Sequence, residues 1–338
     1  MFFDWMKQPQ WWSTSSSPDL RSISHEAVPN GILCPYEYIL DVYGPGHFTK
    51  ILQILDPGLE NNDPKWYQLI LEIMDAIHFG AILVDDVADN SHLRKGRIAA
   101  HRIYGTAETI NRAYLRIFEV IEKCRSAKPS AIPAILDNLT QIHKGQDESL
   151  VWRRDGFDKG LDRAAALTRY RECASLKTGA LFRLIGQLAT GSHEKDQLMS
   201  DFGWYCQLQN DCKNVFSSDV VAAKGALAED LANGEYSFPI LVALYSSPRI
   251  KTAVEKALSA RQGGEFKEHV HNAAMILQED EVRGLCLGEL AILRENNSIF
   301  ASVWGRKEGM LVSQSVPVAE KVGKSKTGYF GFAKRIFV

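Results

Sequence analysis

The sequence lacks the features that mark several large classes of protein. Its longest apolar runs, at residues 78–84 and 238–245, fall well short of the roughly 20 residues of a membrane-spanning helix. Lysine and arginine number 39 against 41 aspartates and glutamates, a formal net charge of -2, whereas a general nucleic-acid binder usually carries a basic excess. The opening residues place Asp4 and a polar run where a secretory signal has its apolar core. We therefore expect no transmembrane segment and no nucleic-acid partner.

Paired cysteines are also missing. The six cysteines are scattered without a CxxC pair, so the sequence indicates neither a zinc site nor a disulfide framework. A reducing intracellular compartment is the default for such a chain, and we take the cytoplasm as the default location.

What the sequence does contain is helical periodicity. From Trp66 to Val84 apolar residues recur three and four positions apart, which predicts an amphipathic helix running into Asp85. The same spacing returns at 107–123, 130–152, 162–190, 195–215, 236–246 and 280–300. Strand-like alternation is scarce. The sequence therefore predicts an all-α, single-domain helical bundle over residues 31–304, with flexible tails at 1–30 and 305–338.

The strongest local signal is the DDVAD run that begins at Asp85. On a helix Asp85 and Asp89 lie on one face, where two carboxylates repel each other by a few tenths of a kcal/mol unless a cation lies between them. Magnesium prefers oxygen ligands and usually shares its coordination between carboxylates and substrate phosphates. Arg94 and Lys95 follow closely and could bind the same phosphate. A solvated acidic helix end is the alternative interpretation of this run.

A second polar cluster lies far downstream, at residues 207–214, with Lys224 shortly after it. Two polar clusters that project from different helices into a bundle interior are how such folds build metal and substrate sites. The two clusters together favour a phosphate-binding enzyme over a solvated acidic surface.

Five sequence blocks in matching order carry a resemblance to a known family. They are DDVADNSHLRKGRIAAHRIYG (85–105), HKGQDESLVWRRD (143–155), LKTGALFRL (176–184), QLQNDCKN (207–214) and KGALAEDLANGEYSFPI (224–240). The chain resembles the trans-type isoprenyl diphosphate synthases, and among them the fungal geranylgeranyl diphosphate synthases and indole diterpene prenyltransferases. The resemblance implies an isoprenoid synthase-type bundle around a central cavity for a prenyl tail, and a homodimer.

Carried over residue by residue, the resemblance implies a binding site for an allylic diphosphate. Asp85, Asp86 and Asp89 match the aspartates that hold magnesium on this diphosphate. Arg94 matches an arginine that binds it directly. The further diphosphate-binding positions are Lys177, Thr178, Gln207, Asn214 and Lys224.

The resemblance also implies a second metal motif and a floor for the tail cavity. In the second motif only Asp211 remains as a carboxylate ligand, because the preceding Asn210 offers a neutral amide oxygen. Gly80 and Ala81, one helical turn before the first aspartate, match the cavity floor. Their small side chains would leave room for a twenty-carbon tail, although close helix packing is an equally good explanation of them.

The acceptor side departs from the pattern of synthases that use isopentenyl diphosphate. His47 and Lys50 stand where those synthases have lysine and arginine, Lys95 replaces an arginine, and His78 is kept. Replacing arginine by lysine loses bidentate phosphate recognition but leaves a point charge. We interpret this pocket as retuned for a smaller phosphate, with ordinary sequence drift as the alternative.

The resemblance therefore implies a magnesium-dependent prenyltransferase that joins geranylgeranyl diphosphate to indole-3-glycerol phosphate and gives 3-geranylgeranylindole, in indole diterpene biosynthesis. Metal-assisted departure of diphosphate would leave an allylic cation, which indole C3 attacks. One alternative is a geranylgeranyl diphosphate synthase that uses isopentenyl diphosphate. Another alternative is a non-catalytic partner subunit. Two further departures from the pattern of the synthases leave it open, because Ser149 stands in place of a usual aspartate and Glu235 in place of a usual lysine.

Overall fold

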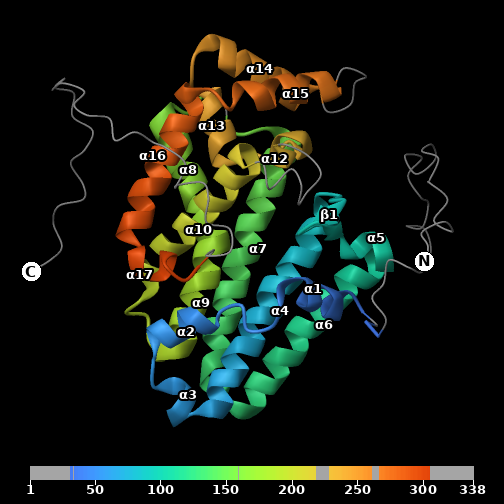
Figure 1. Ribbon diagram of the computed structural model, residues 1–338. Coiled ribbons are helices and arrows are strands. Elements are labelled where there is room, and N and C mark those ends of the chain that lie inside the picture. Colours follow the sequence, from blue (N-terminus) through green and yellow to red (C-terminus); the bar gives the residue numbers. More distant parts are fainter. Residues whose placement is uncertain (1–30, 33, 159, 218–227, 261–265, 305–338) are drawn as a thin grey trace, which may run out of the picture.

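The protein is a bundle of helices. Figure 1 shows the computed structural model from the side, with the helices α4, α6 and α7 running lengthwise. The structure describes residues 31–304 apart from 33, 159, 218–227 and 261–265, so both expected tails lie outside the described residues. The long helices are α4 (Pro64–Ala88), α6 (Thr106–Ala127), α7 (Ile132–Asp155), α9 (Ala180–Thr190), α10 (Asp196–Phe216) and α16 (Asp280–Asn296). Within the described residues the only strands are β1 (Leu93–Arg94) and β2 (Arg97–Ile98), an antiparallel hairpin. The all-α prediction is confirmed.

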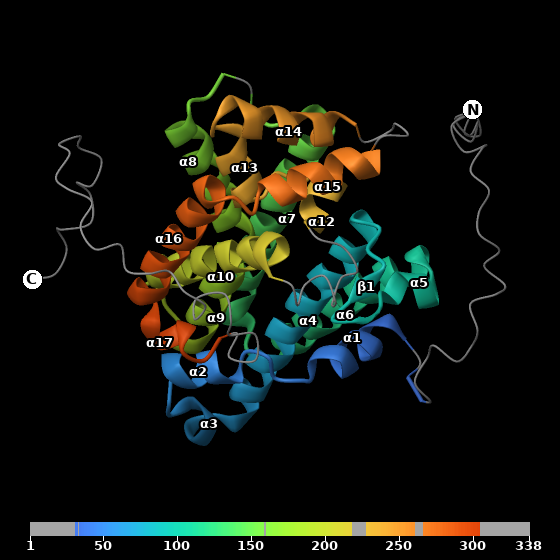
Figure 2. The same cartoon turned by 45° about the horizontal axis from the view of Figure 1, so that its top comes forward.

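Shorter helices surround this body. They are α1 (Pro35–Tyr43), α2 (Thr49–Leu55), α3 (Leu59–Asn62), α5 (Ala100–Tyr104), α8 (Arg163–Ala174), α12 (Glu229–Asn233), α13 (Phe238–Leu244), α14 (Pro248–Ser259), α15 (Phe266–Ile276) and α17 (Ser298–Ala301), with the 3-10 turn η4 (Pro129–Ala131). Figure 2 shows α14 and α15 as a pair across one end of the bundle, with α12 beneath them. A continuous apolar core joins α2 to α17.

Helix α4 is the core helix of the bundle. It begins where Asp63 accepts a hydrogen bond from the backbone N–H of Trp66, with Pro64 at its first position, a favoured combination at helix starts. Its length and mean hydropathy would suffice to cross a membrane, but 67% of its most apolar stretch is buried within the bundle. Packing, chiefly against α6, therefore accounts for its apolar surface, and it delivers the acidic run to the bundle's end.

A single π-helical turn, η5 (Ser175–Gly179), separates α8 from α9. It lies against α10 at a point where backbone meets backbone, because a Cβ atom on Gly203 would approach the Cα of Gly179 to 2.6 Å. Such turns are rare and often mark functional sites. Here the π turn carries Lys177 and Thr178, two of the residues predicted to bind diphosphate.

Candidate active site

The acidic run at the end of α4 is held by basic residues from two other elements. Asp86 is 1% exposed and accepts hydrogen bonds from Nε (2.9 Å) and Nη2 of Arg94, on strand β1. Asp89 accepts a hydrogen bond from Nη1 of Arg153, on α7, at 2.7 Å. The hairpin therefore fixes one of the two carboxylates and α7 the other.

Asp85 and Asp89 are the carboxylates of this run best suited to a metal ion. Asp85 accepts a long hydrogen bond, 3.4 Å, from Nε2 of Gln146. Burial raises the pKa of Asp89, and the nearby carboxylates of Asp85 and Glu235 act in the same direction. A cation stabilises carboxylates that lie close together, so this pair of donors fits a divalent ion that takes its further ligands from elsewhere. Among the described residues no three such side chains converge on one ion position, so the metal role of Asp85 and Asp89 stays a prediction.

The wall opposite α4 is a chain of hydrogen bonds between the π turn and α10. Thr178 donates to Oε1 of Gln207 at 2.5 Å, and Gln207 donates to Oδ1 of Asp211 at 2.9 Å. Oδ2 of Asp211 accepts from the hydroxyl of Tyr170 (2.5 Å) and the backbone N–H of Phe238 (3.1 Å). Burial raises the pKa of Asp211, and these hydrogen bonds partly offset that effect. Both of its oxygens are engaged, so its predicted metal role stays a prediction.

The remaining predicted diphosphate ligands lie in different parts of the chain. Nζ of Lys177 lies 3.5 Å from the hydroxyl of Ser149, and its charge acts on Asp211 and Glu235. Asn214 is 2% exposed and accepts a hydrogen bond from the backbone N–H of Asp230 at 3.3 Å, which places it at the base of α12. Lys224 lies outside the described residues.

The predicted acceptor residues meet in a cluster of aromatic rings. His47 and His78 are stacked, with ring centroids 5.1 Å apart and an interplanar angle of 7°. Tyr43 presents its ring edge-on to both histidines, and Trp304 packs edge-on against His47 at 4.7 Å. Nζ of Lys95 lies 4.9 Å from the centre of the Tyr43 ring. The fourth predicted residue, Lys50, is exposed, and its acceptor role stays a prediction.

The electrostatics of this cluster disfavour a positive charge on His78. Burial lowers the pKa of His78 to about 3, and the neighbouring cationic groups act in the same direction. The loop that carries His47 is fixed by Asp75, a buried carboxylate that accepts hydrogen bonds from the backbone N–H groups of Gly46 (2.8 Å) and His47 (3.3 Å). A stack of two imidazole rings with an ammonium group near its edge can bind a flat ring that carries a phosphate.

The predicted cavity floor divides into two different environments. Gly80 lies in the contact between α4 and α6, where an added Cβ would approach Cδ1 of Ile117 to 2.9 Å, so close helix packing explains this glycine. Ala81 is exposed, and its small side chain leaves the neighbouring space open. The floor role of both stays a prediction.

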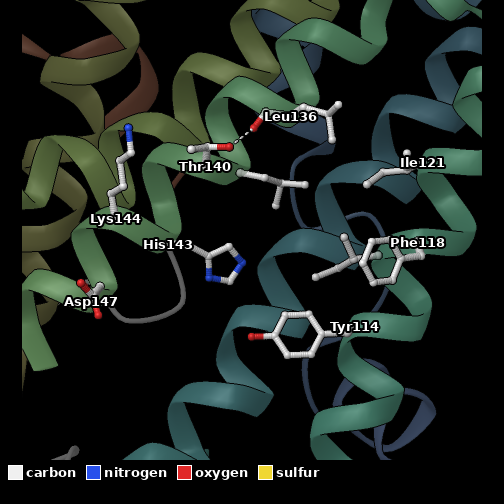
Figure 3. Close-up of a pocket in the computed structure, with 10 residues that line it drawn as sticks. Tyr114, Phe118, Ile121, Leu136, Thr140, His143, Lys144 and Asp147 are labelled. Atoms are coloured by element: carbon white, nitrogen blue, oxygen red, sulfur yellow. Dashed lines mark hydrogen bonds between the residues drawn. The ribbon is translucent and has the colours of Figure 1, made fainter.

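An apolar groove lies between α6 and α7. Its volume is about 520 Å³, and its lining includes Tyr114, Phe118, Ile121, Leu136 and His143. Figure 3 shows Tyr114 and Phe118 on one wall and His143 and Leu136 on the other, with Lys144 and Asp147 at one end. The groove is an apolar space of the size that binding pockets usually have.

Several site residues were missed by the sequence analysis. Gln146 and Arg153 both lie within the block 143–155 that carried the resemblance, and their spacing of seven residues places them on one helix face. Tyr43 and Trp304 gave no comparable signal, because they come to the acceptor cluster from opposite ends of the domain.

Comparison with known proteins decides the family. The polyprenyl synthetase family model matches residues 45–277. The chain belongs to the polyprenyl synthetase family. The resemblance identified from the five sequence blocks is confirmed, and with it the class of enzyme, one that transfers prenyl groups.

Relatives of this family member are similar over most of their length. Prenyl transferase ptmC of Penicillium ochrochloron is 43% identical over 304 residues, covering 89% of this chain and 86% of its own. Prenyl transferase nodC of Hypoxylon pulicicidum is 46% identical over 286 residues, 84% of each chain. A solved polyprenyl synthase from Caulobacter crescentus, in complex with calcium and isoprenyl diphosphate, has a TM-score of 0.63 at 22% identity and covers 79% of this chain and 82% of its own. That structure confirms the fold.

Proposed function

We propose that this enzyme is a magnesium-dependent prenyltransferase of indole diterpene biosynthesis, which transfers a geranylgeranyl group from geranylgeranyl diphosphate to indole-3-glycerol phosphate. The observation that carries the proposal is the pairing of two unlike sites along α4, the acidic run at its C-terminal end and the aromatic cluster around His78. The charge of Lys177, on the π turn, acts on Glu235 beside Asp89, and the charges of Arg94 and Lys95 act on His78.

The donor half of the site binds and orients the diphosphate. Asp85 and Asp89 would hold the magnesium ion, which when bound neutralises the charge that develops on the departing diphosphate. Arg94 is held in place by Asp86 and offers its remaining guanidinium N–H groups to phosphate oxygens. Lys177 approaches the diphosphate from the π turn. The protein thus provides cations on both sides of the leaving group.

The α6–α7 groove is the proposed binding site of the geranylgeranyl tail. Its walls are largely aliphatic and aromatic side chains, which suit a hydrocarbon chain. Phe118 on α6 is 65% exposed and Leu136 on α7 is 47% exposed. Large exposed apolar residues that gather beside a groove are typical of interfaces. We propose that a second copy of the chain covers this rim in a homodimer and closes the groove over the tail.

The acceptor half of the site favours an aromatic nucleophile. The His47–His78 stack and the ring of Tyr43 offer flat surfaces for an indole, and Lys95 lies at the edge of the cluster for its monophosphate. In the reaction, the bond from indole C3 to C1 of the geranylgeranyl group forms as diphosphate leaves. The side-chain hydroxyl next to C3 then loses its proton, and the bond from C3 to that carbon breaks. Its electrons restore the indole, and glyceraldehyde 3-phosphate leaves.

A product assay tests this function. The purified enzyme is incubated with magnesium and geranylgeranyl diphosphate, and is offered either indole-3-glycerol phosphate or isopentenyl diphosphate. The proposal expects 3-geranylgeranylindole from the first acceptor. Longer prenyl diphosphates from the second acceptor alone would contradict it and support a synthase. Product only in the presence of another synthase would support the partner-subunit alternative.

A further inference from the structure

The hydrogen bonds of the wall between the π turn and α10 have a direction that the donors and acceptors decide. Asp211, as a carboxylate, only accepts hydrogen bonds. Its Oδ1 accepts from Nε2 of Gln207 at 2.9 Å, and its Oδ2 accepts from the hydroxyl of Tyr170 (2.5 Å) and the backbone N–H of Phe238 (3.1 Å). The amide nitrogen of Gln207 therefore faces Asp211, and its amide oxygen, Oε1, faces Thr178.

This direction decides which side chain of the wall can donate to a phosphate. The hydroxyl of Thr178 has one proton, which it donates to Oε1 of Gln207 at 2.5 Å. Phosphate oxygens are acceptors, so Thr178 has no proton left for them. The amide of Gln207 has two N–H donors, and among the described residues only Asp211 accepts from them. Gln207 is also partly exposed, so its second N–H is the donor that this wall offers.

Asp211 holds the arrangement from the interior. It is 2% exposed, and its hydrogen bonds join three helices, because Tyr170 lies on α8, Gln207 on α10 and Phe238 at the start of α13. A buried carboxylate oxygen that loses a donor is costly. The amide of Gln207 cannot turn over without placing its oxygen against Asp211 and losing both hydrogen bonds, so its orientation is fixed.

We infer that Gln207 is the side chain of this wall that donates to the allylic diphosphate, and that the side chains hydrogen-bonded around it serve to fix its amide. These positioning residues are Thr178, Asp211 and, through Asp211, Tyr170. The inference revises two roles that the resemblance implied, that of Thr178 as a ligand of the diphosphate and that of Asp211 as a ligand of the metal. It rests on the donor site of the proposed function and is independent of the acceptor.

Binding of geranylgeranyl diphosphate to the full-length protein tests the inference, measured by isothermal titration calorimetry with magnesium and without an acceptor. Tyr170→Phe removes one donor to Asp211, and Thr178→Val removes the donor to Gln207. Each should raise the Kd by about fivefold, the effect of losing one hydrogen bond. Tyr67→Phe is the matched control, because it also removes a buried tyrosine hydroxyl but near the end of α4 opposite the acidic run; its Kd should equal that of the wild type.

The Gln207→Leu background separates positioning from direct contact. Because Tyr170 and Thr178 act through Gln207, adding Tyr170→Phe or Thr178→Val to Gln207→Leu should leave the Kd of the single variant unchanged. A direct contact between Thr178 and the diphosphate, or a general loosening of the fold, would make the effects add, and additive effects would overturn the inference. Thr178→Ser keeps the hydroxyl and should recover the affinity that Thr178→Val loses; no recovery would also count against it.

The outcomes separate this inference from the function it rests on. A wild-type protein that does not bind geranylgeranyl diphosphate would contradict the donor site of the proposed function, and the inference with it. Binding by the wild type, with the same Kd in Tyr170→Phe and Thr178→Val, would overturn the inference and leave the proposed function intact. Thermal unfolding provides a second readout: the ligand should raise the midpoint of both variants less than that of the wild type, and an equal rise would also overturn the inference.

Discussion

The donor and acceptor halves of the site are formed by different kinds of side chain. The donor half consists of buried charges held by ion pairs, Asp86 with Arg94 and Asp89 with Arg153. The acceptor half consists of rings held by one another, with His47 on His78 and Tyr43 at their edge. The difference fits the proposed reaction, in which a departing diphosphate needs charge and an electron-rich aromatic nucleophile needs a shaped apolar surface. It also indicates which substitutions should impair each half. The donor half should be sensitive to the loss of a charged side chain, and the acceptor half to the loss of an aromatic ring.

The largest effect is expected at the metal-binding carboxylates. Asp85→Ala should abolish turnover, a fall of at least about 10³-fold in kcat, because the charge of the departing diphosphate would no longer be neutralised. The measurement is the steady-state rate at saturating substrates. Asp137→Ala, at an exposed aspartate on α7, should keep the wild-type rate. Retained activity in Asp85→Ala would contradict the metal role.

The ion pair between Asp86 and Arg94 should matter for folding as well as for binding. Asp86→Asn leaves Arg94, whose side chain is only 16% exposed, without its carboxylate, and should lower the free energy of unfolding by about 3 kcal/mol. Asp41→Asn removes the partner of Arg97 in an exposed pair and should cost about 1 kcal/mol or less. Chemical denaturation measures both, and equal losses would show that burial does not distinguish the two pairs.

The buried His78 of the acceptor half should make the free energy of unfolding depend on pH. The pKa of His78 is about 3 in the folded protein and 6.5 in its ordinary state, so below pH 6.5 the unfolded chain takes up a proton that the folded protein does not. Stability should therefore fall as the pH drops from 6.5 towards 3. By pH 5 the loss from this residue should be about 2 kcal/mol.

A variant without this histidine isolates the effect. His78→Gln should lose less stability than the wild type between pH 6.5 and pH 5, as measured by denaturation at each pH. Parallel curves for the two proteins would mean that His78 is protonated in the folded state.

The smallest effect is expected from exchanging acceptor cations. The triple variant His47→Lys, Lys50→Arg and Lys95→Arg restores the residues that isopentenyl diphosphate synthases have. It should shift the ratio of kcat/KM values towards isopentenyl diphosphate by about tenfold, or about 1.4 kcal/mol. An unchanged ratio would indicate drift at these positions. The variant also removes one ring from the histidine stack, so Tyr43→Ala, which weakens the cluster without adding phosphate contacts, serves as the control.

Local sequence patterns predicted the long helices well. Interruptions of a helix that depend on packing against another helix could not be predicted from such patterns. The periodicity from Trp66 to Val84 corresponds to α4, and residues 195–215 correspond to α10. Residues 162–190 were expected to be helical throughout, but the structure divides them at the π turn. This turn depends on the backbone contact between Gly179 and Gly203, which joins two helices and leaves no periodic signal.

The same limit applies to the site. Asp85, Asp89 and Arg94 could be found because their charges are close together in the sequence. Their partners could not, because Arg153 and Glu235 reach the run from α7 and from the loop after α12. A sequence pattern shows charges that need partners, and only the folded chain shows which partners they have.

The most direct test of this account is a competition experiment in one reaction mixture. The enzyme, magnesium and geranylgeranyl diphosphate are mixed with equal concentrations of indole-3-glycerol phosphate and isopentenyl diphosphate, and the products are quantified by mass spectrometry. The account predicts 3-geranylgeranylindole in large excess, together with an equivalent amount of inorganic diphosphate. Chain-elongated prenyl diphosphate as the main product would contradict it.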